Sequence, residues 1–146
     1  MRAVPYDHRD ATRLIAAMAD EITLRYGDGG LSPAAPQEFC YPGVFLLAEL
    51  DGAGVGCGGL RPRGAAEGEV KRMYIEPAAR GRGLARVLLA ALVAHAQGAG
   101  MERLLLETGT EQPEAIALYE SAGWRPVPAF GHYAGDPRTR CYAVAL

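Results

Sequence analysis

The stretch EVKRMYIEPAARGRGLARVLLA, residues 69–90, contains the signals that decide the fold. Residues 69–75 predict a strand, which Pro77 ends. Residues 84–97 are rich in Ala and Leu and predict a helix. Arg80-Gly81-Arg82-Gly83 stands between them, where the free amides and the positive dipole end of the helix can hold an anion. This segment therefore predicts an anion-binding turn between a strand and a helix.

The rest of the chain supplies a mixed sheet around that unit. We expect an extended start over 1–5, a helix over 9–26 that Gly27-Asp28-Gly29-Gly30 ends, a short helical turn within 31–42, strands over 44–50 and 55–60 joined by Asp51-Gly52-Ala53-Gly54, a strand around 104–106, a helix from Pro113 to Gly123, and closing strands over 124–127 and 141–146. The order β-α-βββ-α-β-α-ββ predicts an α/β fold with helices on the faces of one mixed sheet. At 146 residues it fits a single domain, 1–146.

Composition excludes several classes of protein. Seventeen acidic and fifteen basic residues give a net charge of −2, which argues against a nucleic-acid binder that relies on a general positive field. The longest strongly apolar run, 87–94, is too short to span a membrane. Cys40, Cys57 and Cys141 are too widely spaced for a zinc site or a disulfide framework, so we expect no metal, and reduced thiols in the cytoplasm.

The glycine–arginine turn matches neither of two common phosphate-binding motifs. No Gly-Lys-Ser/Thr follows, so it is not a Walker loop, and the third glycine of a dinucleotide fingerprint falls on Arg86. By itself the turn is equally compatible with a solvated loop.

Three segments together are similar to one family. Arg80, Gly83 and Ala85 resemble the Gln/Arg-x-x-Gly-x-Gly/Ala signature of the GNAT superfamily of N-acetyltransferases. Residues 69–77 look like the family's central strand, and residues 112–124 look like its second segment. The resemblance covers residues 43–146 in order and spacing, and residues 1–42 in outline. It implies a GNAT-like fold, whose central strands splay apart to form a cleft for acetyl-CoA.

The resemblance also implies which residues hold this co-substrate. The pantetheine arm would pair with the strand's backbone, and the pyrophosphate would take backbone N–H groups from the turn and the helix start, beside its arginines. Gln112 stands where relatives carry an asparagine that touches the pantetheine. The residues implied are Met73, Tyr74, Ile75, Arg80, Gly81, Arg82, Gly83, Leu84, Ala85, Arg86 and Gln112. A bulge is expected in the strand, because strict alternation would place Val70 and Met73 on opposite faces although both look like core residues.

Catalysis in this family is direct attack of an amine on the thioester. Tyr119 matches the usual general acid, and a phenol stays protonated at neutral pH; the alternative is a core tyrosine on the apolar stripe of its helix. Glu69 is the candidate base, acting through water, or else an exposed carboxylate at a strand end. His132 is a second candidate base, or else an incidental histidine of its loop, and Glu107 is a candidate for facing the cofactor or the substrate.

The sequence leaves the chemical class of the acceptor undecided. Arg61, Arg63 and Arg72 lie on or beside strands that lead to the cleft, and arginine binds a carboxylate well; they are equally compatible with solvated charges. With the aromatic loop 130–133 they suit a small amine, such as an amino acid. A protein N-terminus or lysine, or a non-catalytic module that binds CoA, are the alternatives. Family members often form dimers, so a homodimer is a further expectation.

Overall fold

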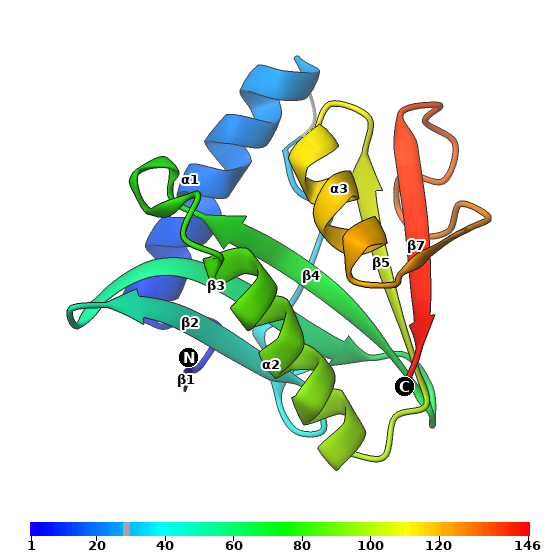
Figure 1. Ribbon diagram of the computed structural model, residues 1–146, viewed down its shortest axis with the longest axis horizontal. Coiled ribbons are helices and arrows are strands. Elements are labelled where there is room, and N and C mark those ends of the chain that lie inside the picture. The colour runs from blue at the N-terminus through cyan, green and yellow to red at the C-terminus, as the bar shows by residue number, and fades with distance from the viewer. Residues whose placement is uncertain (28–29) are drawn as a thin grey trace.

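The computed structural model describes residues 1–27 and 30–146, and its elements follow the predicted order (Figure 1). They are β1 (Arg2–Ala3), α1 (Arg9–Tyr26), a 3₁₀ turn (Pro36–Phe39), β2 (Val44–Leu50), β3 (Ala53–Pro62), β4 (Glu67–Ile75), a second 3₁₀ turn (Pro77–Ala79), α2 (Leu84–Gly98), β5 (Arg103–Gly109), α3 (Pro113–Ser121), β6 (Arg125–Val127) and β7 (Thr139–Ala145). Helix α1 ends at Gly27 as predicted, and this glycine has the left-handed conformation; Asp28 and Gly29 of that stop signal lie outside the described residues.

The strands form one sheet in the order β1-β2-β3-β4-β5-β7-β6. Only β4 and β5 are parallel neighbours, and the other pairs are antiparallel. Helices α2 and α3 lie on one face, and α1 lies on the other (Figure 1). The larger core cluster joins α2 and α3 to the sheet through Leu88, Leu92 and Trp124, while a smaller cluster around Leu14 and Phe45 joins α1 to it. The predicted α/β architecture is confirmed.

Strand β4 contains the predicted bulge. Its register with β3 shifts between Cys57 and Gly59, and Arg72 has a φ of 61°. A left-handed backbone conformation is uncommon for an arginine. The bulge places one extra residue in β4, and the strand pairs with β3 on both sides of it. Val70 and Met73 consequently both pack with the larger core cluster, and the Arg72 side chain lies on the face that α1 covers.

The sheet opens in its middle. Strand β4 pairs with β5 only over Glu67–Val70 and Arg103–Leu106; beyond that point β4 continues along β3, and β5 continues along β7 (Figure 1). The backbone of residues 71–75 therefore has no strand neighbour on the side of β5. Buried backbone polar groups are normally paired, so this free edge indicates a place for an extended ligand.

Candidate active site

A cavity of about 310 Å³ occupies the opening between β4 and β5. Met18 and Ile22 of α1 lie over it, and Leu31 and Tyr133 bring in the loops after α1 and after β6. The Tyr133 hydroxyl donates to the carbonyl of Gly30 at 2.9 Å and so joins the two loops over the opening. The site is consequently a roofed pocket.

The turn before α2 presents unpaired amides. Gly81 and Gly83 have φ values of 75° and 76°, which a side chain would strain. Within the described chain, the amides from Arg82 to Ala85 have no hydrogen-bond partner, whereas the Arg86 amide donates to the Gly83 carbonyl at 3.1 Å. The expectation that Arg86 offers its amide therefore does not fit this geometry. Four free N–H groups at a helix start suit an anion.

The two arginines of the turn have different surroundings. Arg80 donates from Nε to the Ile75 carbonyl at 2.8 Å and from Nη2 to Glu21 at 2.6 Å, and its guanidinium lies 5.6 Å from the centre of the Tyr74 ring. It therefore braces the turn against β4 and α1. Arg82 is exposed and has no ion-pair partner among the described residues. Arg82 is the cation of the turn that is available to an anionic ligand.

Arg82→Glu is expected to weaken acetyl-CoA binding by roughly tenfold or more at low salt, because it replaces attraction to a nearby phosphate with repulsion. The site is exposed, so the high local dielectric and added salt reduce this interaction. Arg125→Glu, on the exposed surface of β6, is the matched control and should bind like the wild type. Isothermal titration calorimetry at two salt concentrations measures both. Equal affinity of Arg82→Glu and wild type would contradict a phosphate site at this turn.

The edge of β4 that β5 leaves uncovered runs from the cavity toward the turn. Met73 lines the cavity, and Tyr74 and Ile75 are buried, so only their backbone edge is offered to a ligand. Gln112 is the cap residue of α3, lines the cavity, and accepts a hydrogen bond from the Tyr26 hydroxyl at 3.2 Å. A free strand edge that leads to four free amides matches a long chain ending in phosphates.

Tyr119 reaches the cavity from α3. It is 5% exposed, and its ring lies 6.0 Å from Trp124 and 6.3 Å from Tyr142 between centroids. No hydrogen bond joins its hydroxyl to any described residue. Burial raises the pKa of this phenol above its usual value, so it stays protonated at neutral pH. The ring is therefore part of the core and the residue also borders the cavity, while its role as general acid stays a prediction.

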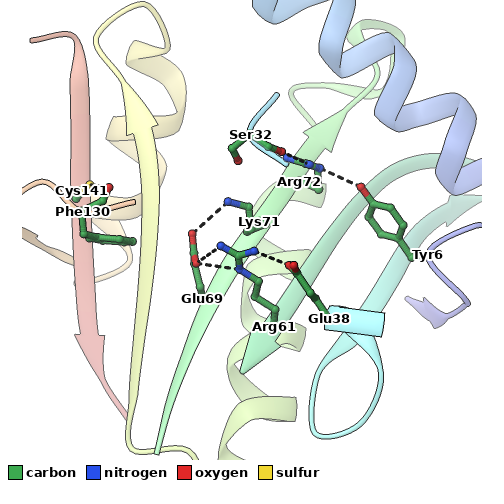
Figure 2. Close-up of polar contacts among 9 residues, drawn as sticks. All are labelled: Tyr6, Ser32, Glu38, Arg61, Glu69, Lys71, Arg72, Phe130 and Cys141. Atoms are coloured by element: carbon green, nitrogen blue, oxygen red, sulfur yellow. Dashed lines mark hydrogen bonds and ion pairs between the residues drawn. The ribbon is translucent and has the colours of Figure 1, made fainter. Parts of the chain in front are cut away.

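Glu69 lies in a chain of charged side chains along β3 and β4 (Figure 2). Its Oε2 accepts from Arg61 at 2.9 and 3.0 Å, and its Oε1 accepts from Lys71 at 3.2 Å; Arg61 also pairs with Glu38. The residue is 3% exposed, in contrast to the alternative of an exposed strand end. Because two cations hold the charge, Glu69 fits a structural role at least as well as that of a base, and its catalytic role stays a prediction.

Glu107 borders the same cavity from the end of β5. Its Oε2 is buried and has no hydrogen-bond partner among the described residues. Burial is the largest influence on this carboxyl, and its pKa is raised. His132, the other sequence candidate, is exposed, packs edge-on against Tyr133, and is not among the residues that line the cavity.

Of the three candidate arginines, one lines the cavity. Arg61 is held by Glu38 and Glu69, and the Arg63 guanidinium lies over the Phe130 ring, 4.7 Å from its centre. Arg72 lines the cavity, is 7% exposed, and donates to the Ser32 carbonyl and the Tyr6 hydroxyl (Figure 2). Both partners of Arg72 are neutral, and no carboxylate in the described chain lies within ion-pair distance of it.

Two groups that the sequence interpretation did not consider also line the cavity. Lys71 follows Glu69 by two residues, and the alternation of a strand could have placed both on one face. Burial lowers the pKa of its amine, against the opposing effect of Glu69. Arg138 is paired with Asp136 at 2.8 Å in the loop that covers the cavity, and no local sequence signal points to that pair.

A sheet that opens between two parallel neighbours, with free amides at a helix start near the opening, is the arrangement that the resemblance to N-acetyltransferases predicts. Residues 13–124 match the family model described as the acetyltransferase (GNAT) family, and the chain belongs to this family. Membership indicates an acyltransferase, as the motifs predicted. None of the helices in the described residues is long and apolar enough to cross a membrane.

The names of individual similar proteins are consistent with membership of this family. The chain is 44% identical to the IAA acetyltransferase of Azospirillum brasilense over 64% of its own length and 61% of that relative. A Klebsiella pneumoniae structure described as an acyl-CoA N-acyltransferase is 34% identical, with a TM-score of 0.83, and the match covers 99% of this chain and 95% of that one. A GNAT family acetyltransferase from Elizabethkingia anophelis with acetyl-CoA bound shares the fold, at 18% identity and a TM-score of 0.65, over 75% of this chain and 80% of that one.

Proposed function

We propose that residues 1–146 act as one N-acetyltransferase domain that moves the acetyl group of acetyl-CoA to a primary amine of a small molecule. The observation that carries the proposal is the roofed cavity at the point where β4 leaves β5. Acetyl-CoA, when bound, supplies the thioester whose C–S bond breaks as the amine nitrogen forms its bond to the acetyl carbon. The roof favours a small acceptor over a protein acceptor, which would need an open groove.

The chain's own residues bind and orient the reactants in this proposal. The β4 edge over Met73–Ile75, which no strand covers and where Arg80 already bonds the Ile75 carbonyl, holds an extended chain. The amides from Arg82 to Ala85 with the Arg82 side chain hold phosphates, and Gln112 offers its side-chain amide. Tyr119 donates a proton to the departing thiolate, because burial keeps its phenol neutral. A module that only binds CoA would need no neutral phenol beside the cavity.

For the acceptor, we propose an amine that bears a carboxylate, such as an amino acid. Arg72 supports this choice, because it is a buried cation at the cavity whose partners in the described chain are neutral. A guanidinium in that state gains most from a carboxylate. A similar protein carries the name IAA acetyltransferase, which is compatible with a small-molecule acceptor.

Release of free thiol from acetyl-CoA with a panel of amines, amino acids and peptides tests the activity. Tyrosine and tyramine differ in the carboxylate, and we expect kcat/KM for tyrosine to be at least about tenfold higher, the effect of one charge-assisted hydrogen bond. An equal or lower value for tyrosine would reject the carboxylate and leave a simple amine. Thiol release with peptides alone would reject the small-molecule acceptor.

A further inference from the structure

The one lysine of the chain, Lys71, lines the cavity. Lysine side chains are rarely buried, yet that of Lys71 is only 8% exposed. It is the first residue of β4 beyond the pairing with β5, which ends at Val70 and Leu106, so it stands where the sheet opens. Tyr119 lines the same cavity from α3. A primary amine of the protein itself therefore lies in the space that we assign to a reacting amine.

The neighbours of Lys71 use only part of its hydrogen-bonding capacity (Figure 2). Its amine makes one hydrogen bond in the described chain, to Glu69 Oε1 at 3.2 Å, although an ammonium group has three N–H donors. The other oxygen of Glu69 is held more closely, because it accepts from Arg61 at 2.9 and 3.0 Å. Glu69 therefore keeps a cation when Lys71 loses its charge.

The surroundings of Lys71 favour its neutral form. Burial is the largest influence on the amine and lowers its pKa. Of the charges that face it, Glu69 on β4 raises the pKa, whereas Arg61 on β3 and Arg72 on β4 lower it. Glu107 on β5 is a further carboxyl within electrostatic reach of this lysine. The net pKa is lowered, so the neutral, nucleophilic amine is more populated at neutral pH than in an ordinary lysine.

We propose that Lys71 Nζ is an acetyl acceptor, so that the protein acetylates its own lysine when acetyl-CoA is bound and no small amine fills the cavity. The inference rests on the proposed function, because it uses the same thioester and the same cavity. It adds a modification site to β4 and makes Lys71 a competitor of the small-molecule acceptor.

The atoms and protons of this step balance. The Lys71 ammonium first loses one proton to solvent, and the neutral nitrogen then forms its bond to the acetyl carbon as the C–S bond breaks. The second proton of the nitrogen replaces the one that Tyr119 gives to the departing thiolate. The products are an acetylated lysine and CoA with a free thiol. The remaining N–H of the new amide can keep the hydrogen bond to Glu69.

Mass spectrometry of the protein tests the modification without a turnover assay. Wild-type protein is incubated with acetyl-CoA and no added amine, and its peptides are mapped over time. We expect Lys71 to be acetylated at least about tenfold faster than the α-amine of Met1, because the cavity holds the two reactants together. Met1 is 46% exposed, so its amine is the internal reference for uncatalysed acylation. An unmodified Lys71, or a Met1 amine that reacts as fast or faster, would overturn the proposal.

Two controls identify the source and the position of the acetyl group. Excess CoA occupies the same site without an acetyl group, so it should slow acetylation of Lys71 and leave that of Met1 unchanged. Lys71→Arg keeps a cation beside Glu69 and lacks the nucleophile, so it should gain an acetyl group on Met1 alone. An undiminished rate in excess CoA, or an undiminished total mass gain in Lys71→Arg, would contradict transfer from the bound thioester to this lysine.

The amine panel separates this inference from the proposed function. A panel amine that releases thiol should slow acetylation of Lys71 when it saturates the protein, and an amine that turns over without slowing it would contradict a shared cavity. If panel amines release thiol and Lys71 stays unmodified, the inference fails while the proposed function stands. If Lys71 is acetylated and no panel amine releases thiol, the proposed small-molecule activity fails while Lys71 stands as an acceptor.

Discussion

Replacing Tyr119 by phenylalanine is expected to lower kcat by about 10²- to 10⁴-fold with acetyl-CoA and the best amine of the panel. The change deletes the proton donor and keeps the ring. Because the thiolate leaves more slowly without a proton, the loss should fall on kcat more than on KM. Steady-state thiol release measures it.

Stability should hardly change in Tyr119→Phe, since the hydroxyl has no hydrogen-bond partner in the described residues and its removal leaves none unpaired. Tyr142→Phe is the matched control. It lies against the same ring, but its hydroxyl donates to Glu120 at 2.9 Å and does not border the cavity. Its turnover should stay at the wild-type value. A Tyr119→Phe enzyme with wild-type kcat would make Tyr119 a core residue only.

Arg61→Met is expected to lower the free energy of unfolding by about 2–3 kcal/mol. Glu69 is buried, and loss of its doubly bonded guanidinium leaves Lys71 as its one cation among the described residues. The remaining pair keeps the expected cost below that of a fully stranded buried charge, roughly 3–5 kcal/mol. Urea denaturation at pH 7 measures the change.

Two further variants separate the parts of this network. Glu38→Gln removes only the outer, half-exposed partner of Arg61 and should cost less than about 1 kcal/mol. Adding both Glu69→Gln and Lys71→Met to Arg61→Met removes the two buried charges that Arg61→Met leaves, and should restore part of the loss. If this triple variant is less stable than Arg61→Met, those two charges are not the source of the destabilisation.

The positions of glycine and proline, together with the apolar residues of the strands, made most of the fold predictable. Pro77, the turn at residues 80–83 and the helix after it are local signals, and the structure reproduces each of them. The bulge was also predictable, because Val70 and Met73 are both apolar although three positions apart. These features depend on residues close in sequence.

The partners and surroundings of the acidic residues could not be predicted in the same way. Glu69 lies directly opposite Arg61 in the β3–β4 register, and that pairing requires the alignment of two strands. The isolation of Glu107 depends on what β4, β7 and a distant loop leave around it. Sequence spacing identifies a carboxylate, but its partners come from tertiary structure.

The divergence of β4 from β5 also bears on self-association. Exposed strand edges invite pairing with other chains, and here the outer edges of the sheet are very short: β1 has two residues, and β6 has three, one of them Pro126. The long unpaired edge, residues 71–75, is recessed between two halves of one sheet and roofed by α1. Because it is recessed, this edge is poorly placed to pair with the edge of another sheet, so it adds little to the tendency of the protein to aggregate.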